Sequence, residues 1–268
     1  MFYRENEYTI ERPGCTVHYW VSDNPEKPLL FFAHGAYVDH VQFDPQLLDV
    51  IEEYQIIRWD MRGHGESKPL AGPFSVKDAA DDALSILERM DRKGAIFIGQ
   101  SAGTYVTQEL AFQHPDRVKA MVIIDGTCIT SKLSVVESLS VRISPIALTL
   151  WPYNNLKKAM VAASAIKADT RRYLTEAFDR LSKDEFATIW KGLASCIHYE
   201  PDYHVTCPLL LVHGAYDNTG NIKKAMHEWA QHDPQSIYVV IPDAGHGANQ
   251  DNATFFNGLM VAFLRGVK

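Results

Sequence analysis

The chain has 268 residues, of which 46% are hydrophobic and 22% charged, so we expect one sizeable globular core. Its formal net charge of −7 argues against nucleic acid or an anionic membrane surface as a partner. The first residues lack the pattern of a secretory signal, and no stretch approaches the ~18 apolar residues of a membrane span.

The first third of the sequence predicts strands separated by glycine-rich loops. Residues 8–11 and 16–22 have the character of a short hairpin. Residues 28–35, "PLLFFAHG", form a compact apolar run that ends at glycine, which is typical of a strand buried on both faces. Residues 56–67 show a similar pattern, in which a predicted strand is followed by a glycine-rich loop.

The next elements alternate between helix and strand. Residues 75–90 carry apolar side chains at helical spacing, and 102–115 form a second helix that ends at Pro115. Apolar strands are expected at 95–99, 118–126, 208–214 and 236–242, and an amphipathic helix at 253–266. This alternation predicts an α/β fold with a mostly parallel sheet covered by helices on both faces.

Residues 128–205 interrupt the alternation. They contain several helical patterns and no convincing strand. We therefore expect a helical lid, or cap, over 128–205, inserted into a core made of 1–127 and 206–268.

The stretch "GQSAG" at 99–103 has the pattern G-x-S-x-G between a predicted strand and a predicted helix. The two glycines allow a tight turn, and this turn would present Ser101 at the carboxyl edge of the sheet. A serine hydroxyl is a weak nucleophile unless a base and an orienting acid accompany it.

Candidates for both partners follow later strands. Asp217 comes after the strand at 208–214, and His246 lies in a glycine-flanked loop after the last strand. The order Ser, Asp, His is the one expected for a nucleophile on such a turn. Asp125 also ends a strand and is the alternative acid.

An acyl-transfer site also needs two backbone N–H groups for the developing oxyanion. We expect these from Ala102, directly after the nucleophile, and from Ala36 in the loop after an early strand, with Tyr37 as the alternative to Ala36. Candidate pocket residues are Tyr37, Gln100, Trp151 and Trp190.

Five segments resemble the α/β-hydrolase fold superfamily across nearly the whole chain. They are "HGAY" at 34–37, "DMRGHGES" at 60–67, "GQSAG" at 99–103, "GAYDNTG" at 214–220 and "DAGHGANQD" at 243–251. The resemblance implies an eight-stranded, mostly parallel sheet with a helical lid after the sixth strand. It is nearest to small bacterial esterases, enol-lactonases and carbon–carbon bond hydrolases.

The sequence thus predicts a serine hydrolase that cleaves a carboxylic ester or lactone of a small to medium apolar substrate through a Ser-His-Asp triad and an acyl-enzyme, without cofactor or metal. A carbon–carbon bond hydrolase with the same triad and a hydrolase-derived ligand receptor remain alternatives. Histidines 198 and 204, with Glu200 and Asp202, have only a weak likeness to a metal site. The widely spaced cysteines favour free thiols and a cytoplasmic location; they are Cys15, Cys128, Cys196 and Cys207.

Overall fold

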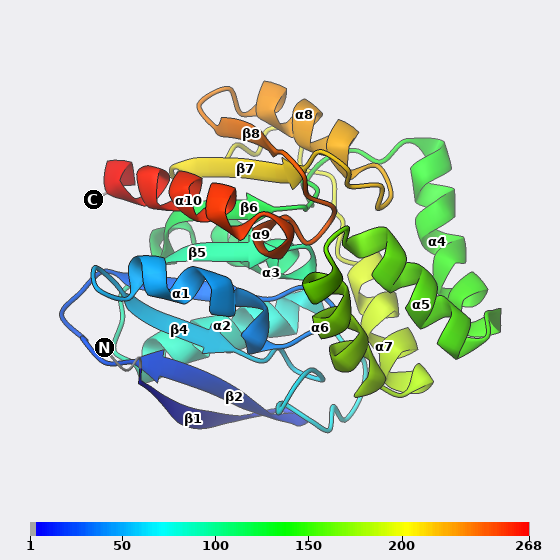
Figure 1. The fold of residues 1–268 in the computed structure, drawn as a ribbon, viewed down its shortest axis with the longest axis horizontal. Coiled ribbons are helices and arrows are strands. Elements are labelled where there is room, and N and C mark those ends of the chain that lie inside the picture. The colour runs from blue at the N-terminus through cyan, green and yellow to red at the C-terminus, as the bar shows by residue number, and fades with distance from the viewer. Residues whose placement is uncertain (1–3, 268) are drawn as a thin grey trace.

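The computed structural model describes residues 4–267, in which eight strands form one sheet (Figure 1). The strands are β1 Glu5–Arg12, β2 Cys15–Ser22, β3 Leu29–Ala33, β4 Gln55–Trp59, β5 Ala95–Gln100, β6 Val118–Ile124, β7 Leu209–Gly214 and β8 Ile237–Ile241. Their order across the sheet is β1-β2-β4-β3-β5-β6-β7-β8. The first two pairings, β1 with β2 and β2 with β4, are antiparallel, and the others are parallel. This confirms the predicted mostly parallel sheet.

Helices cover both faces of the sheet, because the central strands are apolar on both. In β3, Leu29 and Phe31 pack with α2 and α3, whereas Leu30 and Phe32 pack with α1 and α10. Figure 1 shows α1 and α10 on the near face and α2 and α3 behind. The helices of the two layers are α1 Asp44–Val50, α2 Val76–Arg89, α3 Ala102–Gln113, α8 Ile222–His232, α9 Ala248–Asp251 and α10 Ala253–Val267.

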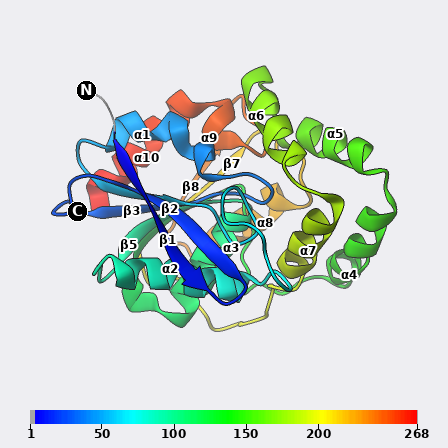
Figure 2. The same ribbon diagram turned by 90° about the horizontal axis from the view of Figure 1, so that it is seen from below.

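Four further helices lie between β6 and β7 in the sequence and gather beyond the carboxyl ends of the parallel strands (Figures 1 and 2). They are α4 Val135–Leu150, α5 Tyr153–Ser164, α6 Ala168–Asp179 and α7 Lys183–Ala194. Capping boxes begin two of them, with Ser134 and Glu137 at α4 and Ser182 and Glu185 at α7. We call residues 128–205 the helical insert; its role as a lid stays a prediction.

Within residues 4–267, no helix combines the length and the apolar character needed to cross a membrane.

Candidate active site

Ser101 lies in the sharp turn between β5 and α3, with φ 48° and ψ −114°. Two glycines make this turn possible. A Cβ on Gly103 would lie 1.9 Å from the carbonyl oxygen of Ala33, and one on Gly99 would lie 2.7 Å from that of Gly103. The glycines therefore let α3 and two strands approach closely while Ser101 is held in a conformation that L-residues rarely adopt.

Ser101, His246 and Asp217 form a continuous hydrogen-bonded row. His246 Nε2 lies 2.9 Å from Ser101 Oγ, and His246 Nδ1 lies 3.0 Å from Asp217 Oδ2. The three residues come from loops after β5, β8 and β7, which all end at one edge of the sheet. With Nδ1–H donated to the carboxylate, Nε2 is free to accept the serine proton.

The electrostatics of Asp217 suit the orienting role. Burial alone would raise the pKa of its carboxyl group, but the contact with His246 and the hydrogen bond from the Thr219 amide outweigh burial and lower that pKa. Asp217 is thus held as a carboxylate whose charge favours an imidazolium at His246.

Asp125, the alternative acid, is placed differently. Its Oδ1 accepts a hydrogen bond from the Gly214 amide at 2.9 Å, and its Oδ2 accepts one from the Ala248 amide at 3.0 Å. Burial, followed by the charge of Asp217, raises its pKa well above the usual value. Asp125 therefore ties the end of β7 to the segment after His246, whereas Asp217 is the carboxylate that accepts the hydrogen bond of the imidazole.

Ala36 and Ala102 both line the cavity beside Ser101. Ala102 is the first residue of α3, where amide groups have no partner within the helix. The loop that carries Ala36 is held by His34, whose Nδ1 lies 2.7 Å from the Gly35 carbonyl oxygen and whose Nε2 accepts from the Met61 amide at 2.9 Å. Ala36 and Ala102 therefore both lie next to the serine, and the role of their amides as oxyanion donors stays a prediction.

Gln42 has a part in the site that sequence reasoning missed. Its Oε1 accepts from the Gly35 amide, and its Nε2 donates to Gln100 Oε1 at 3.0 Å. Gln100 Nε2 in turn donates to the His246 carbonyl oxygen at 2.7 Å. Both glutamines are buried. This hydrogen-bond chain joins the Ala36 loop to the backbone of the histidine.

A cavity of about 200 Å³ adjoins Ser101. Its lining is mostly apolar and comes from both the core and the helical insert; the residues include Val38, Tyr105, Val141, Met160, Leu174, Trp190, Leu193, Ile197 and Ile222. Tyr37, Gln100 and Trp190 line it, and Trp190 donates from Nε1 to Ser144 Oγ at 2.9 Å. Trp151 does not line this cavity, because it follows the end of α4 and is 47% exposed.

The helical insert is hydrogen-bonded to the loop that carries His246. The Gly247 amide donates to the Ser164 carbonyl oxygen at 2.8 Å. Asp251 accepts hydrogen bonds from the amides of Gly245, Ile166 and Lys167 at 2.9, 2.9 and 3.0 Å. The junction of α5 and α6 is therefore fixed to the histidine loop.

Comparisons with known proteins agree with this fold. Residues 28–143 match the family model described as the alpha/beta hydrolase fold. The chain is 28% identical to a 2-(acetamidomethylene)succinate hydrolase of Mesorhizobium japonicum over 86% of this chain and 85% of that protein.

Two solved structures share the fold over nearly their full lengths. A hydrolase from Pseudomonas aeruginosa has a TM-score of 0.85 and 21% identity, covering 97% of this chain and 98% of that one. An enol-lactonase from Burkholderia xenovorans has a TM-score of 0.83 and 20% identity, covering 96% of this chain and 100% of that one.

Proposed function

Because this chain belongs to the α/β-hydrolase superfamily, we propose that it is a serine hydrolase that cleaves an uncharged carboxylic ester or lactone. The observation that carries the proposal is the row of hydrogen-bond distances from Ser101 through His246 to Asp217, 2.9 and 3.0 Å, inside a cavity of mostly apolar lining. Such a row supplies a nucleophile, a base and an orienting acid in contact with one another.

In the proposed acylation step, His246 Nε2 takes the proton of Ser101 Oγ as this oxygen attacks the substrate carbonyl carbon. The resulting oxyanion accepts hydrogen bonds from the amides of Ala36 and Ala102. Asp217 stabilises the imidazolium. His246 then gives its proton to the departing alkoxide, and the acyl group remains on Ser101.

Deacylation reverses these roles with water. His246 removes a proton from a water molecule that attacks the acyl carbon, and the same two amides receive the second oxyanion. The proton returns to Ser101 Oγ as the carboxylic acid leaves. The reaction as proposed uses side chains, backbone amides and water, with no cofactor.

The lining of the cavity supports an uncharged substrate. Among the described residues that form it, there is no Lys, Arg, Asp or Glu. A carboxylate on the substrate would lose its water there without gaining a cationic partner, which is costly. The Mesorhizobium relative is named for a succinate derivative, and the described lining of this cavity offers no Lys or Arg for a carboxylate of such a molecule.

We also propose that the helical insert acts as a lid. It contributes Val141, Met160, Leu174 and Trp190 to the cavity, so its position decides which acyl and alcohol groups fit. All four cysteines, at 15, 128, 196 and 207, are free thiols, which supports a cytoplasmic location.

Three measurements test the proposal. Intact-mass analysis after fluorophosphonate treatment should give one adduct on the wild type and none on Ser101→Ala. No adduct on folded wild type would overturn the serine mechanism. Steady multiple turnover separates an enzyme from a receptor, and a diketone substrate tests carbon–carbon bond cleavage.

A matched pair of esters tests the substrate class. p-Nitrophenyl butyrate and p-nitrophenyl hemisuccinate have acyl chains of similar length, and only the second carries a carboxylate. We expect kcat/KM to be at least about tenfold higher for the butyrate, because burying an unpaired charge is costly. Equal values would contradict the assignment of an uncharged substrate.

A further inference from the structure

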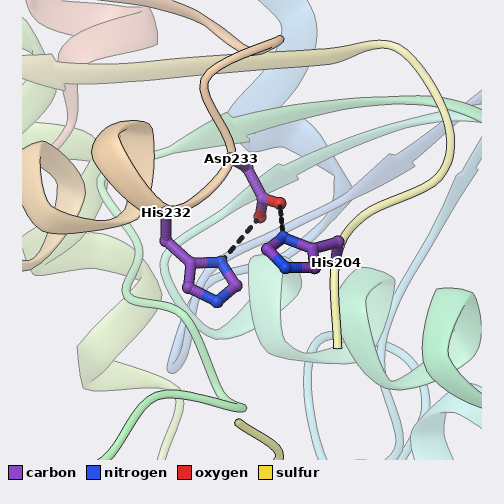
Figure 3. A group of neighbouring side chains, drawn as sticks. All are labelled: His204, His232 and Asp233. Atoms are coloured by element: carbon purple, nitrogen blue, oxygen red, sulfur yellow. Dashed lines mark hydrogen bonds and ion pairs between the residues drawn. The ribbon is translucent and has the colours of Figure 1, made fainter. Parts of the chain in front are cut away.

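His204, His232 and Asp233 form a compact cluster away from the triad (Figure 3). His204 lies in the segment that returns from the helical insert to β7, His232 is the last residue of α8, and Asp233 is the C-cap of α8. None of the three lines the cavity beside Ser101. The proposed hydrolysis mechanism does not use any of these three side chains.

Both imidazole rings turn the same nitrogen toward one carboxylate (Figure 3). His204 Nδ1 lies 3.0 Å from Asp233 Oδ1, and His232 Nδ1 lies 3.6 Å from Asp233 Oδ2. One donor atom from each residue lies within 4.8 Å of the other two. The rings are nearly parallel, with centroids 4.3 Å apart.

The carboxylate is fixed and lacks a strong cation. The Asp233 side chain is 2% exposed, and the indole Nε1–H of Trp229 donates to its Oδ2 at 2.9 Å. In the described part of the chain, no Lys or Arg forms an ion pair with it. It also follows the carboxyl end of α8, where the helix dipole favours positive charge. The site therefore favours an added cation.

We propose that His204, His232 and Asp233 bind a late first-row divalent metal ion, for which zinc is the best match. Donors bonded to a tetrahedral zinc lie about 3.3 Å apart. His204 Nδ1 lies 3.0 Å from Asp233 Oδ1 and His232 Nδ1 lies 3.6 Å from Oδ2, and the donor atoms of the three residues all lie within 4.8 Å of one another, so a small shift of the side chains suffices to bind one ion. Two imidazoles exclude calcium and magnesium as preferred ions, since these take oxygen donors.

The remaining contacts complete the site. The Trp229 indole orients the carboxylate as outer-shell donors do around bound metals. The side chains of His204 and His232 are 57% and 41% exposed, so water can reach the fourth coordination position. A bound ion would fasten the segment returning from the helical insert to the end of α8.

Zinc titration calorimetry on full-length, tag-free, chelator-treated protein tests the site. The variants are His204→Ala and His232→Ala, and the matched control is His227→Ala, which removes an exposed histidine from α8 itself. Cobalt(II) provides a second probe, because four-coordinate binding gives strong visible absorption. Far-UV circular dichroism and thermal unfolding check that each variant is folded, including variants of the triad.

We expect one zinc per wild-type chain, at least about tenfold weaker binding in each site variant, and unchanged binding in the control. Failure of the wild type to bind zinc would overturn the proposal. So would zinc binding that survives both substitutions but is lost in His246→Ala, because that ion would lie on the triad.

Discussion

The buried carboxyl groups of Asp125 and Asp217 lie close together, with an oxygen of each and a ring nitrogen of His246 all within 4.8 Å of one another. Two carboxylates this close do not both ionise readily. The contacts of Asp217 with His246 lower its pKa, whereas burial and the neighbouring charge raise that of Asp125. Asp217 therefore carries the negative charge, and Asp125 holds two backbone segments together through its hydrogen bonds.

This division of roles makes Asp217→Asn the more damaging of the two substitutions for activity. Asparagine preserves the shape but removes the charge that orients and stabilises the imidazolium, so we expect kcat to fall by about 10⁴-fold. The measurement is steady-state hydrolysis of p-nitrophenyl butyrate. Asp125→Asn should cost less, up to about 10²-fold, since a tether acts only through position. If Asp125→Asn abolished turnover while Asp217→Asn retained it, the two roles would be reversed.

The raised pKa of Asp125 also predicts how stability depends on pH. In the unfolded chain an aspartate titrates near pH 4. Above that pH, and up to the raised pKa, the folded protein holds a proton on Asp125 that the unfolded chain has lost, so the contribution of Asp125 to the free energy of unfolding falls as the pH rises. Asp125→Asn removes this contribution. Urea unfolding at several pH values between about 4 and 7 should therefore show that the stability of the variant relative to the wild type increases with pH, and parallel curves would contradict this prediction.

The sequence was sufficient to predict the sheet and the placement of Ser101, Asp217 and His246 at one edge of it, because strand ends and glycine-rich loops are recognised from local patterns. Contacts between distant segments were not predictable in this way. Gln42 and Gln100 are 58 positions apart and join the site through side-chain hydrogen bonds. The outward position of Trp151 depends on how α4 packs, which helical spacing alone does not determine.

Gln42 provides a test of the chain from the Ala36 loop to His246. Gln42→Ala removes the acceptor of the Gly35 amide and the donor to Gln100, so both loops lose a support. Displacement of catalytic groups by about 1 Å costs up to about 10²-fold in rate, and we expect kcat to fall by about 10- to 100-fold. The matched control is Gln231→Ala, on the exposed side of α8. Equal kcat values for the two variants would show that the chain does not support the site.

Two glycine substitutions should change stability in opposite directions. The Cβ of Gly103→Ala would lie 1.9 Å from the Ala33 carbonyl oxygen, so we expect a loss of at least about 2 kcal/mol in the free energy of unfolding, with loss of labelling at Ser101. Gly258, in α10, has open space at its Cβ position. Gly258→Ala should therefore gain about 0.4–1 kcal/mol by restricting the unfolded chain. Denaturant unfolding measures both, and a stable, reactive Gly103→Ala protein would contradict the close approach of α3 to β3.

Asp251 links the helical insert to the catalytic histidine loop, and Asp251→Asn tests that link. The carboxylate accepts amide hydrogen bonds from Gly245 on one side and from Ile166 and Lys167 on the other. Asparagine replaces one acceptor oxygen with a donor, so at least one buried amide loses its partner at a cost of about 1–3 kcal/mol. We expect faster proteolytic cleavage near the junction of α5 and α6, together with slower fluorophosphonate labelling of Ser101, because both segments rely on the same carboxylate.

Asp243→Asn, in an exposed part of the same loop, serves as the control and should change neither rate. Faster cleavage with unchanged labelling would mean that the insert moves independently of His246.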